Sequence, residues 1–71
     1  MTPKTYALWW CKDRKLDLET LKTDKHFSNA AQLNALICDM RDAHYRFWEI
    51  SNIVDRTNEY CKAVYVYKKA A

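Results

Sequence analysis

The chain has 71 residues, of which 49% are hydrophobic and 30% charged, and its 12 Lys and Arg against 9 Asp and Glu give a formal net charge of +3. A chain this short forms a single domain, residues 1–71, and excludes a deep cleft between domains, because a domain of roughly 60 residues buries only about 60% of its unfolded surface. The apolar fraction excludes a disordered chain. The modest charge allows weak phosphate contact but lacks the concentrated basic character of a dedicated nucleic-acid domain.

The sequence contains no signal for membrane insertion or secretion. No apolar run reaches the roughly 18 residues of a membrane span, and the N-terminus lacks the apolar region of a secretory signal. Cys11, Cys38 and Cys61 are odd in number and widely spaced, unlike a disulfide scaffold. We therefore expect small apolar cysteines in a reducing compartment, a cytoplasmic protein and no membrane contact.

The N-terminal part of the chain predicts two β-strands. Residues 5–11 are short, aromatic and preceded by a proline, which favours a strand. Residues 12–15 are polar and suit a hairpin loop. Residues 16–19 alternate between leucine and acidic side chains, which is typical of a half-buried strand, and residues 20–27 connect it to the next element.

Residues 28–44 predict an amphipathic helix. Apolar side chains recur at steps of three and four, polar side chains take the other side, and a Ser-Asn pair at the start can cap the first turn. Such a helix buries Leu33, Ile37 and Met40 on one face.

Residues 46–54 fit either of two elements. Their aromatic and β-branched composition favours a strand, although Phe47, Ile50 and Val54 also have helical spacing. Residues 55–59 form a polar break.

Residues 60–68 predict the last strand, which pairs with 46–54 as a hairpin. Alternation places Val64 and Val66 on the inner face and Tyr65 and Tyr67 on the open face. The predicted fold is α+β: a small antiparallel sheet in the order ββαββ with one amphipathic helix on one face. The alternative is one long helix over residues 28–59 with terminal strands.

The sequence predicts no enzyme, cofactor or metal site. The absence of glycine excludes a Gly-rich phosphate loop and a nucleophile elbow. His26 and His44 lack the spacing of zinc ligands relative to the cysteines. We expect His26 in a solvated loop and His44 at a helix end, where its charge suits the helix dipole.

The surplus of aromatic residues predicts a binding face. One helix cannot cover both faces of the predicted sheet, so large rings remain exposed, and exposed rings with basic neighbours are typical of interaction sites. The alternative is that the rings fill a small core and the charges are merely solvated. The expected partner-facing residues are Tyr65, Tyr67, Lys69, Phe47, Trp9, Lys12, Arg14 and Lys15.

The predicted order of elements resembles that of several small phage proteins, including some anti-CRISPR proteins. The resemblance rests on the helix over 28–40 followed by 47–54 and 60–67, and it covers most of the chain as an element order only. It implies stoichiometric inhibition by occupying the surface of a nuclease complex, such as a bacterial CRISPR effector. It carries no functional residue to this sequence.

The expected function is that of a non-catalytic, phage-encoded binding protein that occludes a surface of a larger protein or nucleoprotein complex in a bacterial host. One alternative is a small nucleic-acid-binding regulator. A second is a structural homodimer whose sheets pair face to face or edge to edge.

Overall fold

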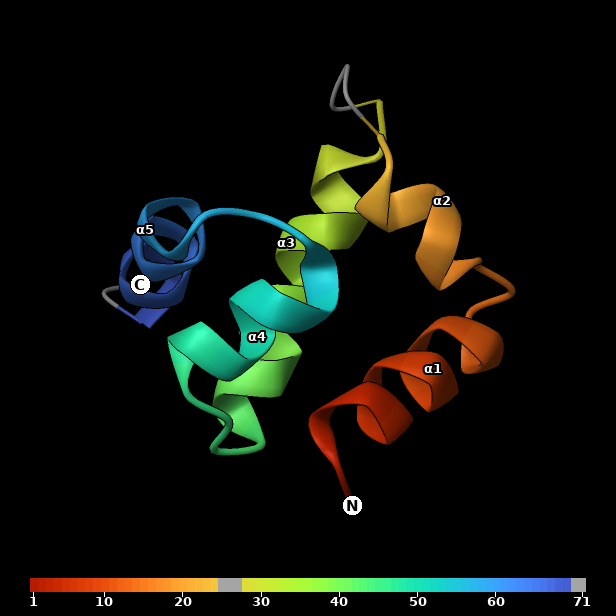
Figure 1. Ribbon diagram of the computed structural model, residues 1–71, viewed down its shortest axis with the longest axis horizontal. Coiled ribbons are helices and arrows are strands. Elements are labelled where there is room, and N and C mark those ends of the chain that lie inside the picture. Colours follow the sequence, from red (N-terminus) through yellow and green to blue (C-terminus); the bar gives the residue numbers. More distant parts are fainter. Residues whose placement is uncertain (25–27, 70–71) are drawn as a thin grey trace.

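The computed structural model describes residues 1–24 and 28–69, with side chains as far as residue 66, and this part of the chain forms five helices and no strand. The helices are α1 (Pro3–Asp13), α2 (Leu18–Lys22), α3 (Ala30–Asp42), α4 (Phe47–Val54) and α5 (Asn58–Lys69) (Figure 1). The predicted α+β fold with an antiparallel sheet is therefore wrong. The alternative of one helix over 28–59 is also wrong, because the chain leaves the helical conformation between α3 and α4 and again between α4 and α5.

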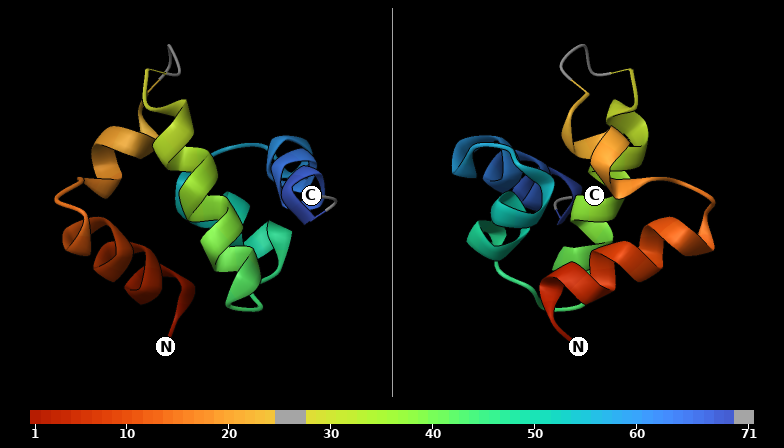
Figure 2. Two further views of the ribbon diagram at one scale, coloured as in Figure 1. Left: turned by 180° about the vertical axis from the view of Figure 1, so that it is seen from behind. Right: turned by 45° about the vertical axis from the view of Figure 1, so that its right-hand side comes forward.

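Helix α3 occupies the centre of the fold and packs against each of the other four helices. Helices α1 and α5 lie on opposite sides of it (Figures 1 and 2). A single apolar cluster joins all five helices. Its buried members are Ala7, Trp10, Cys11, Leu18, Leu21, Leu33, Leu36, Ile37, Met40, Ile50, Val54 and Cys61.

Residues 5–11, predicted as a strand, belong to α1. The Thr2 hydroxyl oxygen accepts a hydrogen bond from the Thr5 backbone N–H at 3.1 Å, and Pro3 stands in the first turn, where its missing N–H has no consequence. In a strand the adjacent Trp9 and Trp10 would point to opposite faces. In the helix Trp10 is buried at 2% exposure, and Trp9 is 52% exposed. The buried positions 7, 10 and 11 have helical spacing.

Residues 16–19, also predicted as a strand, contain the start of α2. The Asp17 carboxylate accepts a hydrogen bond from the Thr20 backbone N–H at 3.1 Å and so caps the helix. Leu18 and Leu21 then point into the core. The short alternation of leucine and acid is thus a cap followed by one helical turn rather than a strand.

The predicted helix over 28–44 is confirmed as α3, slightly shorter at both ends. Leu33, Ile37 and Met40 are buried, as their spacing predicts. This segment alone combines a continuous apolar stripe with a polar opposite side, so its periodicity was decisive.

The last two predicted strands, 46–54 and 60–68, are helices α4 and α5. Ile50 and Val54, four residues apart, are fully buried. Val64 packs against the core as predicted, but Val66 is 54% exposed and Tyr65 is half-buried against the core, which reverses the prediction for these two residues. Residues two apart stand about 200° apart on a helix, so positions 65 and 67 do not share a face. Packing of a helical stripe overrides β-propensity here.

Three helices end without glycine, although a residue one or two positions beyond each takes the left-handed conformation that glycine normally supplies. These residues are Lys15 (φ 59°), His44 (φ 71°) and Asp55 (φ 55°). In each case the next N–H donates to a carbonyl five residues earlier, which is the bond of a Schellman motif. The three bonds are Leu16 to Cys11 at 2.8 Å, Tyr45 to Met40 at 3.1 Å and Arg56 to Ser51 at 3.3 Å.

The order of strands and helix that supported the resemblance to anti-CRISPR proteins is absent from residues 1–24 and 28–69, so the fold lends that resemblance no support. Within the same residues, no helix is both long enough and apolar enough to cross a membrane.

Candidate nucleic-acid interface

Helices α4 and α5 form a compact pair joined by the short turn 55–57. Helix α4 has 8 residues and α5 has 12. Figure 1 shows α5 nearly end-on while α4 runs across the view, so the two helices cross steeply. Two helices crossing in this way through a turn of three or four residues constitute a helix-turn-helix.

The turn is fixed by the left-handed conformation of Asp55 and by Thr57, which caps the start of α5. Asp55 has φ 55° and ψ 47°, which reverses the chain at the position where such turns often contain glycine. The Thr57 hydroxyl oxygen then accepts a hydrogen bond from the Tyr60 N–H at 3.1 Å, and the Thr57 carbonyl accepts one from the Cys61 N–H at 3.1 Å. Thr57 thus fixes where α5 begins.

A small residue lies where α4 meets α5. Ser51 is 5% exposed and hydrogen-bonds to the fully buried Cys61, while its hydroxyl donates to the Arg56 carbonyl in the turn. Burial raises the pKa of the Cys61 thiol, and the bond to Ser51 and the nearby Arg56 charge oppose that shift only in part. The thiol therefore stays neutral and acts as a packing residue.

Helix α5 is fixed to α3 by two polar contacts. The Tyr60 hydroxyl donates to Asn34 Oδ1 at 2.7 Å, and Arg41 Nη1 donates to the Tyr65 carbonyl at 3.1 Å. Because both contacts involve side chains anchored on the central helix, they set the orientation of α5 as well as its position.

The turn is also fixed to α2 through Arg56. Its guanidinium donates to the carbonyls of Lys22 at 2.7 Å, Asp24 at 2.9 Å and Leu21 at 3.4 Å. These carbonyls lie at the C-terminal end of α2, where a cation is favourable. Arg56 therefore couples the N-terminal half of the chain to the helix-turn-helix.

The side of α5 that faces away from the core carries five exposed residues, and we call it the α5 outer face. Its first turns are polar, and the described side chains in its middle are small or apolar. The members are Asn58, Glu59, Lys62, Ala63 and Val66.

The start of α4 lies beside the middle of this face. Lys62 Nζ stands 5.7 Å from the centre of the Phe47 ring, within cation–π range. Arg46, the exposed residue before α4, has its backbone N–H bonded to Glu49 Oε2 at 2.8 Å, which fixes the chain there. Arg46 and Lys62 thus place two cations around the start of α4 and the α5 outer face.

The structure separates the predicted partner-facing residues into two groups. Phe47 lies beside Lys62 at the helix-turn-helix, and Tyr65 packs half-buried against the core. Tyr67 and Lys69 belong to α5, but their side chains, like that of Lys68, lie outside the described part. Trp9, Lys12, Arg14 and Lys15 lie on or just after α1, which packs against α2, α3 and α4.

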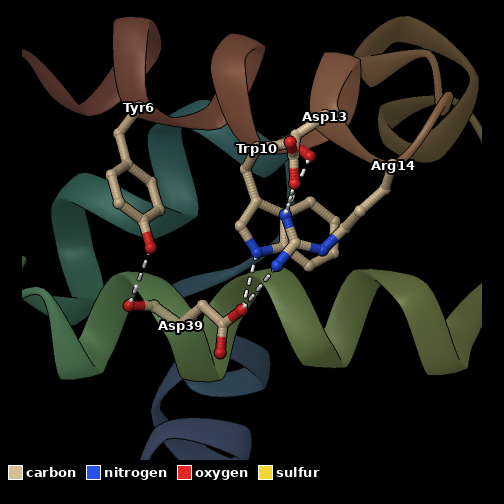
Figure 3. Close-up of polar contacts among 5 residues, drawn as sticks. All are labelled: Tyr6, Trp10, Asp13, Arg14 and Asp39. Carbon is tan, nitrogen blue, oxygen red and sulfur yellow. Dashed lines mark hydrogen bonds and ion pairs between the residues drawn. The ribbon is translucent and has the colours of Figure 1, made fainter.

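Arg14, predicted to face a partner, instead joins α1 to α3 (Figure 3). Its guanidinium stacks 4.1 Å from the centre of the Trp10 ring and stands 3.6 Å from Asp39 Oδ2. The same carboxylate accepts the Trp10 indole N–H at 2.6 Å, and the Asp39 carbonyl accepts the Tyr6 hydroxyl at 3.3 Å. Burial and Asp39 raise the pKa of Tyr6, so its hydroxyl remains a donor.

Exposed apolar side chains remain on α1. Leu8 and Trp9 are 48% and 52% exposed, and the Tyr6 ring lies between those of Trp9 at 5.8 Å and Tyr45 at 5.5 Å. A shallow groove of about 390 Å³ runs between α1 and α3, and its lining includes Trp10 and Arg14. Trp9 is thus exposed as the partner-facing prediction requires, and Lys12 and Lys15 near it are also exposed.

The residues of the α5 outer face were missed because residues 55–59 were interpreted as a loop between strands. Two signals in the sequence could have revealed them. One is Ser51, a small residue between the apolar Ile50 and Ile53, four residues before an Asp that tolerates positive φ. The other is Thr57, a good N-cap, directly before a second amphipathic stretch.

The three cysteines lie in the core. Cys11, Cys38 and Cys61 are buried and not disulfide-bonded, and burial raises the pKa of the Cys11 thiol. No group of three or more His, Cys, Asp or Glu within residues 1–24 and 28–66 could hold a metal ion. His44 is exposed just beyond the end of α3, and His26, like Lys25, lies outside the described residues.

Comparison with family models, with curated proteins and with solved structures gives no match to this chain. Its function has to be inferred from its own geometry.

Proposed function

We propose that this protein binds double-stranded DNA through the helix-turn-helix of α4 and α5, with α5 in the major groove. The observation that carries the proposal is the crossing of α4 and α5 through the turn at Asp55, which leaves the polar α5 outer face exposed. This function corresponds to the nucleic-acid-binding regulator that the sequence analysis gave as an alternative.

The dimensions of α5 suit this ligand. Its 12 residues span about 18 Å at 1.5 Å per residue. The major groove of B-DNA is about 12 Å wide and admits one α-helix. On the described part of the outer face Ala63 and Val66 follow Lys62, and side chains of this size allow the helix to enter the groove.

Two cations near the start of α4 support the proposal. In a helix-turn-helix the first helix crosses the DNA backbone, and here α4 begins beside Arg46 and close to Lys62. Phosphate contacts position the protein on the duplex. With a net charge of only +3, we expect few such contacts and a moderate salt dependence.

The test is a fluorescence anisotropy titration of a labelled duplex of about 25 base pairs. Lys62→Glu should weaken binding severalfold or more because it replaces a cation with a carboxylate on the surface that enters the major groove. The matched control is Lys12→Glu, which makes the same charge change on the exposed side of α1, away from α5. If three phosphates are contacted, binding should fall about 40-fold between 50 and 200 mM salt.

Two outcomes would contradict the proposal. The wild-type protein might show no saturable binding to any duplex at low salt, or Lys62→Glu and Lys12→Glu might weaken binding equally. The second result would mean that the protein attracts DNA through net charge alone.

A second candidate function is supported by Leu8 and Trp9, which are about half exposed on α1. Exposed large apolar side chains are typical of protein-binding surfaces. This is the non-catalytic protein-binding function expected from the sequence, now on α1 instead of a sheet. Trp9→Ser should then abolish capture of a protein partner from a host lysate while leaving DNA binding unchanged.

A further inference from the structure

The first two turns of the α5 outer face combine three different hydrogen-bonding side chains. Asn58 is the first residue of α5, and Glu59 and Lys62 follow within the next four positions, all exposed. In a helix-turn-helix, the N-terminal residues of the second helix contact the base edges. From Asn58 to Lys62 the helix rises about 6 Å, which spans about two base-pair steps of 3.4 Å.

Each of these side chains suits a different base. An asparagine amide can bond both N6 and N7 of adenine, and a lysine ammonium can donate to O6 and N7 of guanine. A glutamate carboxylate only accepts, so its natural partner in the major groove is the N4 amino group of cytosine. The three bases would fall within about three base pairs of each other.

Glu59 is the most informative of the three, because a carboxylate on a DNA-facing surface is repelled by phosphate. Among residues 1–24 and 28–66, none of the ion pairs of the fold involves Glu59. Among the described residues the Glu59 carboxylate is exposed and unpaired, so it would face a docked duplex as a charge. A cytosine amino group can compensate for the repulsion, whereas the acceptor edges of guanine and thymine add to it.

Resting on the proposed DNA-binding function, we infer that Asn58, Glu59 and Lys62 determine sequence specificity, and that Glu59 selects a cytosine by excluding other bases. Specificity is here a difference between affinities that a repulsive group can enlarge. Removing the Glu59 charge should therefore tighten binding to most sequences and weaken discrimination at one position. That combination separates a specificity residue from a simple contact residue.

The experiment is selection of binding sites from a randomised duplex pool at about 100 mM salt, followed by titration of the selected and single-base variant duplexes. The proteins are the wild type, Glu59→Gln and Glu59→Ala, with Asn58→Ala and Lys62→Ala as parallel variants. The matched control is Glu19→Gln, which removes an exposed carboxylate from α2. Circular dichroism confirms that each variant is folded.

The wild type should select a site that contains cytosine at one position, with a preference of about 5- to 150-fold over other bases. Glu59→Gln and Glu59→Ala should bind random duplexes more tightly than the wild type and lose that preference, while Glu19→Gln keeps it. Asn58→Ala and Lys62→Ala should each relax the preference at a neighbouring position.

Different results would overturn different statements. If the wild type binds no duplex, the proposed function itself is wrong. If it binds duplex DNA but the Glu59 variants keep the wild-type base preference, DNA binding stands and the inference about Glu59 is wrong.

Discussion

Replacing Lys15 by glycine should stabilise the protein. Lys15 follows α1 with φ 59°, in the left-handed region, and its side chain is exposed. For an ordinary L-residue this conformation costs roughly 1–2 kcal/mol. Glycine avoids that penalty but loses about 0.4–1 kcal/mol because its unfolded chain is more flexible. The balance is a gain of about 0.5–1 kcal/mol in the free energy of unfolding.

The same substitution three residues earlier provides the control. Lys12 is an equally exposed lysine inside α1, with ordinary helical geometry. Lys12→Gly removes the same charge and should destabilise by about 0.5–1 kcal/mol, because glycine is unfavourable within a helix. His44→Gly and Asp55→Gly should stabilise less than Lys15→Gly, since His and Asp tolerate positive φ better than Lys.

Thermal unfolding followed by circular dichroism measures these differences. For a domain of this size, 1 kcal/mol shifts the melting temperature by about 4–8 °C. Lys15→Gly should therefore melt about 2–8 °C above the wild type, and Lys12→Gly about as far below it. If the two variants shift in the same direction, the helix ends are not held by left-handed residues as described.

Three further predictions concern the helix-turn-helix and its supports. Ser51→Leu overpacks the buried contact with Cys61 and should destabilise by about 1–3 kcal/mol in urea unfolding, whereas Asn52→Leu, exposed on the same helix, should stay within about 0.5 kcal/mol. Arg56→Gln removes the charged donor from the end of α2 and should raise amide hydrogen exchange there, while Arg46→Gln leaves it unchanged. Burial raises the pKa of Cys61 above that of an unfolded thiol, so the free energy of unfolding should be constant below about pH 8 and fall as pH rises through the folded pKa, with a smaller fall in Cys61→Ala.

The sequence was sufficient to locate α3 because that segment satisfies several signals at once. Its apolar stripe is continuous and its other side is polar, so no competing pattern fits, although the expected side-chain cap at Asn29 does not form. In α1, α4 and α5 the aromatic and β-branched residues that favour strands are also the residues that fill the core. Composition and packing pointed in opposite directions there, and only the positions of the buried residues decide between them.

The turns were hidden for a different reason. A chain without glycine lacks the residue that usually marks a helix end. Here Lys15, His44 and Asp55 take the left-handed conformation instead, and their residue types do not reveal this in the sequence. The candidate site depends on one of these turns, so missing the end of α4 also meant missing α5. Phe47, expected to face a partner from a strand, stands instead at the start of α4 beside Lys62.

Helix α5 has one side that packs against the core and another, the α5 outer face, that is exposed. Positions 61, 64 and 65 pack against the core, and the Tyr60 hydroxyl bonds to α3, so their chemistry is constrained by stability. Asn58, Glu59 and Lys62 are exposed and do not belong to the apolar cluster, so core packing does not require an amide, a carboxylate and an ammonium at these positions. Glu59 should even oppose the weak attraction that a charge of +3 has for phosphate. A protein that only needed to adhere to DNA would gain from a neutral residue there, and the carboxylate therefore favours a surface that discriminates among sequences over one that binds them all.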